Sequence, residues 1–176
     1  MTPIAALFVR SDSHYKVMPF VDAYDHQRDA LTWPGGCPAI YHPPCRAWGR
    51  YKAVAKPRDG ERELALWSLS MVRRFGGVIE HPLSSDLWRS AGCLSPGIRD
   101  AHGGVLVTLN QGDFGHRAPK ATGLYLVGCD VPALPFELAS CSHSVERMGR
   151  AERERTPERF AAFLVDLARS VRGVRA

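Results

Sequence analysis

Two short polar segments of this chain hold the residue types best able to do chemistry. In the first, Ala39 to Arg46 (AIYHPPCR), an apolar run ends in two prolines, followed by Cys45. Proline cannot donate to a strand ladder, so this pair predicts the end of a strand and the start of a stiff loop. In the second, Glu80-His81-Pro82, a carboxylate and an imidazole end another apolar run. Each segment is expected at the end of a strand, where α/β proteins place their chemistry.

A predicted helix at Glu61–Phe75 joins the two strands. If the strands are parallel neighbours, both segments lie at one edge of the sheet. Cys45 is then a candidate nucleophile, because basic neighbours lower a thiol pKa. Glu80 is a candidate general acid if burial raises its pKa. The catalytic candidates are therefore Cys45 and Glu80, and the neighbouring candidates for substrate contacts are His42, Pro44, Arg46 and His81.

Structural roles compete with each of these assignments. Cys45 could be a packed thiol. Glu80 could form an ion pair with Arg46 or Arg50. The two histidines could orient the loop backbone through ring hydrogen bonds. A metal site built from Cys45 and the histidines matches no zinc spacing.

Two further clusters suit a nucleotide. The polar loop 110–122 carries glycines together with three basic side chains, His116, Arg117 and Lys120, and this combination suits a phosphate. A solvated hairpin tip is the competing interpretation. Asp22 and Asp25 follow the second predicted strand, where an acid can receive ribose hydroxyls. Helix capping by Asp25 with a local ion pair competes with that role.

The elements that must position these residues alternate between strand and helix. Strands are expected at 4–9, 17–24, 38–42, 78–80, 103–109 and 123–127, and helices at 61–75 and after Thr156. The pattern predicts a single α/β domain with a Rossmann-like, mostly parallel mixed sheet, whose last two strands are antiparallel. Residues 1–145 form the expected core. Residues 146–176 form a charged linker and an amphipathic helix that packs on it.

Composition narrows the class of protein. The 176 residues are 45% hydrophobic and 23% charged, which is typical of a globular protein. No apolar run approaches the roughly 20 residues of a membrane helix, and no signal peptide is evident, so a cytoplasmic location is expected. The net charge of +5 is compatible with a nucleic-acid or phosphate partner. Five scattered cysteines without a C-x-x-C pair indicate neither a disulfide scaffold nor a zinc knot.

Taken together, these elements resemble the catalytic core of cytosine-5 DNA methyltransferases, and more narrowly the short methyltransferase-like proteins of phages and prophages. The matching segments are His42-Pro43-Pro44-Cys45, Glu80-His81-Pro82 and the Gly115-x-x-x-x-Lys120-x-Thr122 loop. The resemblance implies a Rossmann-like sheet that binds S-adenosylmethionine. It also implies a Cys45 that attacks cytosine C6, a Glu80 that steadies the ring at N3, and an Arg117 that positions that glutamate or a phosphate.

The chain departs from that family at several positions. No glycine-rich cofactor loop follows the first strand, Arg46 and His81 replace a Gln and an Asn, and no target-recognition domain is present. The cofactor therefore stays open. We expect a methyltransferase-like protein that binds or modifies a nucleotide or nucleic-acid base at a site formed by Cys45 and Glu80. The alternatives are a nucleoside-processing transferase and a non-catalytic interaction protein, with homodimerisation through the last helix or the Trp88 region.

Overall fold

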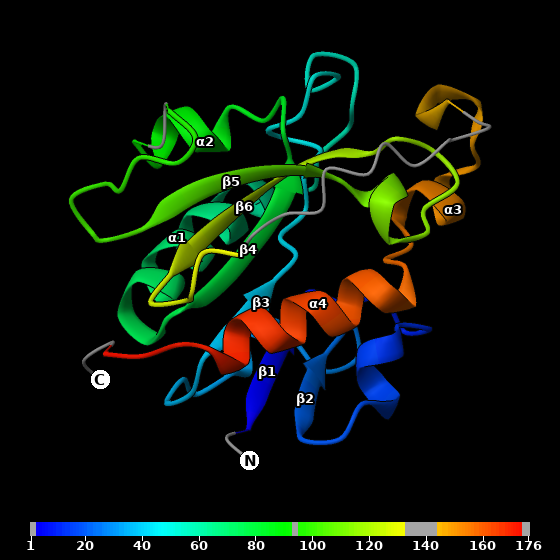
Figure 1. Cartoon of the computed structure of the whole chain (residues 1–176). Helices are drawn as coiled ribbons and strands as arrows, with labels where there is room; N and C mark the ends of the chain where they lie inside the picture. The colour runs from blue at the N-terminus through cyan, green and yellow to red at the C-terminus, as the bar shows by residue number, and fades with distance from the viewer. Residues whose placement is uncertain (1–2, 93–94, 133–143, 174–176) are drawn as a thin grey trace.

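The computed structural model describes residues 3–92, 95–132 and 144–173. They form a six-stranded mixed sheet with helices on both faces, so the predicted α/β fold is confirmed (Figure 1). The strand order is β2-β1-β3-β4-β6-β5. The strands are β1 (Ile4–Leu7), β2 (Val21–Tyr24), β3 (Ala39–Tyr41), β4 (Gly77–Pro82), β5 (Val105–Asn110) and β6 (Ala121–Val127).

The first four strands run parallel, and the last two are antiparallel to each other, as the sequence predicts. The chain returns past β5, so that β6 lies between β4 and β5 and antiparallel to both. The predicted second strand is shorter than expected, because residues 14–17 form a 3-10 turn, η1 (His14–Val17), before β2 begins. Asp25 does not cap a helix there, since the next turn, η2 (Ala30–Thr32), is capped by Asp29.

Two amphipathic helices cover opposite faces of the sheet. Helix α1 (Glu61–Phe75) has the predicted bounds and packs its buried side on β3 and β4. Helix α4 (Glu158–Arg169) crosses the other face, against β1, β3 and β4. The helix expected after Thr156 begins one residue later than predicted, because Pro157 occupies the N-cap position. Helices α2 (Leu87–Ser90) and α3 (Arg150–Glu154) are shorter.

Gly77 brings β3 and β4 close together at their first residues. Its φ is +119°, and a Cβ atom there would lie 1.9 Å from the carbonyl oxygen of Ala39. Only glycine allows this approach. The register that results pairs Tyr41 with Ile79, so the residues that follow, His42 and Glu80, come to lie side by side.

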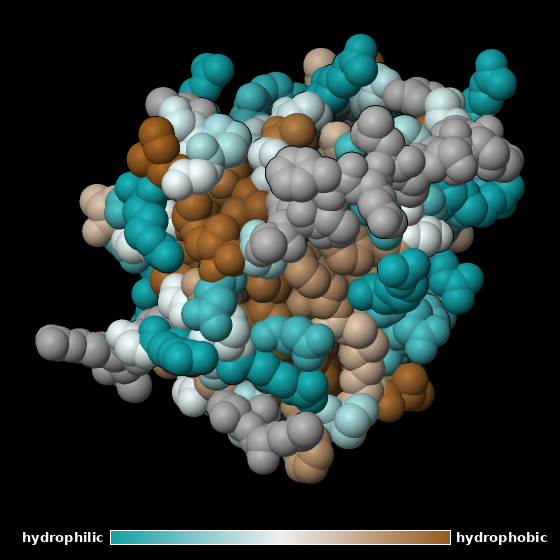
Figure 2. Space-filling model, viewed as in Figure 1, coloured by the Kyte–Doolittle hydropathy of each residue, from teal (hydrophilic) through white to brown (hydrophobic). Residues whose placement is uncertain are grey.

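The surface view adds one feature of the face that α4 crosses. An apolar area lies over β4, β5 and β6, and hydrophilic side chains surround it (Figure 2). In the part of the chain that the structure describes, no helix is long and apolar enough to span a bilayer.

Candidate functional site

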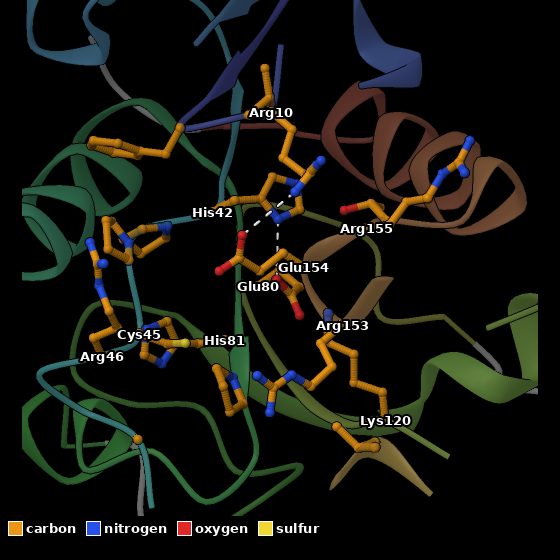
Figure 3. A pocket seen from close by; sticks show the side chains of 18 of the residues that line it. Arg10, His42, Cys45, Arg46, Glu80, His81, Lys120, Arg153, Glu154 and Arg155 are labelled. Carbon is orange, nitrogen blue, oxygen red and sulfur yellow. Dashed lines mark hydrogen bonds and ion pairs between the residues drawn. The ribbon is translucent and has the colours of Figure 1, made fainter. Parts of the chain in front are cut away.

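A pocket of about 810 Å³ opens at the carboxyl ends of β1, β3 and β4. We call it the strand-end pocket. The chain places β2 on one side of β1 and β3 on the other, so the strand order reverses here. Open α/β sheets bind their ligands at such a reversal. The pocket is lined by the segments that follow these strands, by the loop after Cys45, and by residues of α3 (Figure 3).

Glu80 and His42 meet near the centre of the strand-end pocket. The Nδ1 atom of His42 lies 3.1 Å from Oε2 of Glu80, and both side chains are about nine-tenths buried. Figure 3 shows Cys45, Arg46 and His81 on one side of this pair, and Lys120 and Arg153 to Arg155 on the other. The expected convergence of Cys45 and Glu80 is therefore seen, since both line one pocket.

Glu80 has a second partner from a distant part of the chain. Gln111, in the 3-10 turn η3 (Gln111–Phe114), donates from Nε2 to Oε1 of Glu80 at 2.8 Å and to Oγ1 of Thr122 at 3.0 Å. Burial opposes ionisation of Glu80, but the His42 hydrogen bond and the charge of Lys120 outweigh it, and the pKa of Glu80 falls to about 2. Glu80 is thus a carboxylate at neutral pH, and the raised pKa that a general acid needs is not found.

Tyr15 fixes the ring of His42 from the opposite side. The hydroxyl of Tyr15, which is fully buried, lies 3.1 Å from Nε2 of His42. A carboxylate can only accept, so Nδ1 of His42 donates to Glu80. In the neutral imidazole, Nε2 then accepts from Tyr15, whose pKa is raised well above 10 by its burial. The ring is held in one orientation.

Cys45 is exposed in the loop after β3. Desolvation by its surroundings and the negative charge of Glu80 raise the pKa of Cys45, against an opposing effect of Lys120. The lowering expected from basic neighbours does not prevail over these two effects. The guanidinium of Arg46 is held by another carboxylate, since its Nε donates to Glu61 at 2.8 Å. That pairing also means that Arg46 is not the ionic partner of Glu80.

His81 is fully buried in the wall of the strand-end pocket. Strand alternation places it on the α1 side of the sheet, where its ring meets Trp88 edge-on at 6.0 Å. The hydrogen-bond partner of His81 is the backbone of Pro44. Burial lowers the pKa of His81 to about 4, despite the opposing charge of Glu80. His81 is therefore neutral at neutral pH.

Four predicted residues lie away from the pocket lining. His116 is buried and bonds through Nδ1 to the backbone of Ala118. Arg117 forms an ion pair with Glu152 of α3 at 2.5 Å. Asp22 pairs with Arg28, while Asp25 pairs with Lys16 and accepts from two backbone N–H groups. For the two aspartates, the ion pairs of the competing interpretation are found, whereas the helix capping by Asp25 that it also included is not.

Several residues of the site were missed by the sequence analysis. They are Arg10, Tyr15, Gln111, Arg153 and Arg155. Gln111 carried a signal, since a polar residue ending an apolar strand resembles the Glu80 segment. The sequence pattern of α3 was misleading, because its mixed charges are typical of a solvated helix face and not of a pocket lining.

The described residues hold no group of three or more metal-ligating side chains. The acidic side chains expected to hold the S-adenosylmethionine that the resemblance implies have other partners. The ring of Phe8 and the Arg10–Asp12 ion pair occupy the segment after β1, and the two aspartates are bound elsewhere.

Comparison with known proteins leaves the site to be interpreted from its own geometry. No protein-family model, curated protein or solved structure matches this chain.

Proposed function

We propose that the protein binds a nucleotide or nucleic-acid base in the strand-end pocket. The observation that carries this proposal is the ionised carboxylate of Glu80, held between His42 and Gln111 in the wall of a pocket at the strand-order reversal. Such a group recognises N–H or O–H donors on a ligand. Phe8, Pro43 and Pro44 supply apolar wall for a planar ring.

Unpaired cations at the pocket supply the second half of a nucleotide site. Seven Lys and Arg residues line the pocket against four Asp and Glu residues. Within the described chain, Lys120, Arg153 and Arg155 form no ion pair, and neither does Arg50. Free cations at a pocket entrance suit phosphate groups.

A reaction at Cys45 is the second candidate function, favoured by its place in the same pocket. In a methyltransferase-like or nucleoside-processing reaction, the thiol would attack the bound base after losing its proton. Because the pKa of Cys45 is raised in the free protein, such a step requires a bound ligand that changes its surroundings. A non-catalytic interaction protein is the outcome if Cys45→Ala leaves every function intact.

The binding proposal is tested by calorimetric titration with a panel of nucleoside monophosphates and short single-stranded oligonucleotides. We expect Glu80→Ala to weaken binding by about 100-fold, since it removes a buried charge from the contact. Glu63→Ala is the matched control, because Glu63 is exposed on α1 and lies outside the pocket lining. Absence of binding to every member of the panel would overturn the proposal.

The partner and location predictions belong to the same proposal. We propose a cytoplasmic protein whose partner is a nucleotide or nucleic acid, and homodimerisation is measured separately by light scattering. A nucleic acid carried through purification would raise the ratio of absorbance at about 260 nm to that at about 280 nm, as expected of a basic protein that binds phosphates.

A further inference from the structure

The carboxylate of Glu80 has acceptor positions that the protein does not fill. An ionised carboxylate offers about four such positions and no donor. His42 fills one on Oε2, and Gln111 fills one on Oε1. The side chain is 12% exposed and lines the strand-end pocket. Each oxygen therefore keeps a position for a ligand, and the two lie next to each other.

The neighbouring groups prevent any other arrangement of this carboxylate. The amide nitrogen of Gln111 donates to both Glu80 and Thr122, which fixes the direction of the amide. His42 is fixed between Glu80 and Tyr15. Groups held in place by two partners lose little freedom when a ligand binds. The pocket thus presents two fixed acceptors side by side.

Lys120 presents a donor near the same acceptors. It lines the strand-end pocket on the opposite side of Glu80 from Cys45 (Figure 3), and its charge acts on both of these groups. The side chain lines the pocket, is half-buried, and has no hydrogen-bond or ionic partner in the described ranges. An ammonium group can only donate. The complete pattern is two acceptors and one donor.

We propose that the strand-end pocket recognises the edge of a guanine-type ring that carries an amino group, a ring N–H and a ring oxygen side by side. In pyrimidine numbering this is the 2-amino-4-oxo edge. The amino group and the ring N–H donate to the two oxygens of Glu80, and the ring oxygen accepts from Lys120. This inference rests on the proposed nucleotide binding and names its base. Guanine carries this edge, with an amino donor and an oxygen acceptor flanking the ring N–H.

Cytosine and adenine fit the same groups poorly. Each places an unprotonated ring nitrogen, an acceptor, next to its amino group. That nitrogen would face a carboxylate oxygen, so two acceptors would meet and one hydrogen bond would be lost. The proposed base therefore differs from the cytosine that the family resemblance implies.

Guanine nucleotides and pterins share the recognised edge, and phosphate contacts distinguish them. Arg153 and Arg155 line the pocket, form no salt bridge with the residues that the structure describes, and favour a phosphorylated ligand. A pocket of about 810 Å³ has room for either ring system with its substituent.

The test is calorimetric titration of the whole chain at pH 7 with GMP, IMP, AMP, CMP and a pterin without phosphate. We expect GMP to bind more tightly than IMP, which lacks the amino group, by about 5- to 150-fold. AMP and CMP are expected to bind more weakly still. A pterin that binds while GMP does not would support the recognised edge and assign the unphosphorylated source.

A designed change of preference provides the sharper measurement. In Glu80→Gln, the amide turns one acceptor and one donor to the ligand, which match the ring N–H and adjacent oxygen of xanthine. Its second amide hydrogen is accepted by Nδ1 of His42, whose ring proton then lies on Nε2 and is donated to Tyr15. We expect this variant to prefer XMP over GMP, while Glu63→Gln keeps the preference for GMP. A gain of XMP binding also shows that the variant is folded.

The negative results separate this inference from the function on which it rests. Binding of AMP or CMP as tight as that of GMP overturns the guanine assignment and leaves nucleotide binding in place. A Glu80→Gln variant that binds other nucleotides normally but shows no change in base preference also overturns it. Absence of binding to all of these ligands overturns the proposed function itself.

Discussion

Two buried carboxylates at the ends of parallel strands show how differently one chemical group is used in this molecule. Asp25 follows β2, and Glu80 lies two residues before the end of β4. Each has a pKa of about 2. The partners of Asp25 are close in sequence: Lys16 and the backbone N–H groups of Gln27 and Arg28. The side-chain partners of Glu80 come from 38 and 31 residues away.

The difference lies in what remains for a ligand. Asp25 is 3% exposed and lies outside the lining of the strand-end pocket, so its contacts stabilise a local turn and leave no group for a ligand. Glu80 is held by long-range partners and still faces the pocket. A lowered pKa alone therefore does not identify a site, because both structural and binding carboxylates have one.

The largest expected effect concerns acid stability at the β4 end of the sheet. The pKa of His81 is about 4 in the fold, below its usual 6.5. Between pH 6.5 and 4, His81 binds a proton in the unfolded chain but stays neutral in the folded protein. The stabilisation is therefore complete above pH 6.5 and is lost as the pH falls toward 4. We expect the free energy of unfolding to fall by about 3 kcal/mol across this range.

Urea unfolding at a series of pH values measures this loss. His81→Gln cannot titrate and should flatten the profile between pH 6.5 and 4, whereas His102→Gln, at an exposed position, should not. An unchanged slope in the His81 variant would contradict a buried neutral imidazole.

A smaller effect separates the two carboxylates directly. Asp25→Ala removes an ion pair and two backbone hydrogen bonds, so we expect a loss of about 2 kcal/mol in the free energy of unfolding. Ligand affinity should not change, in contrast to Glu80→Ala. Thermal unfolding and calorimetric titration of both variants check this pair of results. Weakened ligand binding in the Asp25 variant would mean that the β2 end belongs to the site.

The smallest expected effect is on the reactivity of Cys45. The charge of Glu80 raises the pKa of this thiol, and the charge of Lys120 lowers it. Alkylation by iodoacetamide should therefore speed up a few-fold in Glu80→Gln and slow down in Lys120→Met, because the thiolate is the reacting form. Peptide mass spectrometry follows Cys45 separately from the other four cysteines. Equal rates in all three proteins would show that these charges do not act on the thiol.

Much of the framework could be predicted because its signals are local. The apolar spacing and following glycines gave the bounds of the Glu61–Phe75 helix, and the proline pair gave the end of β3. A helix between two strands also predicted that they are parallel neighbours, which is why Cys45 and Glu80 could be placed in one pocket.

The polar contacts within the pocket could not be predicted, because they depend on strand order. Gln111 reaches Glu80 only because β6 lies between β4 and β5. The direction of the pKa of Glu80 and of Cys45 was also beyond the sequence. It depends on the groups that the fold brings together: His42 and Lys120 lower the pKa of Glu80 against its burial, while burial and the charge of Glu80 raise the pKa of Cys45. Spacing along the chain does not encode these contacts.

The reversed strand β6 has a consequence for the order in which the molecule assembles. Because it runs against β4, it brings Lys120 and Thr122, at its beginning, to the edge where the parallel strands finish. During synthesis, the first four strands can therefore pair while Glu80 still lacks Gln111. The recognition groups come together only when the last hairpin docks, so we expect a chain truncated before residue 111 to have no competent site, even where its parallel strands have formed.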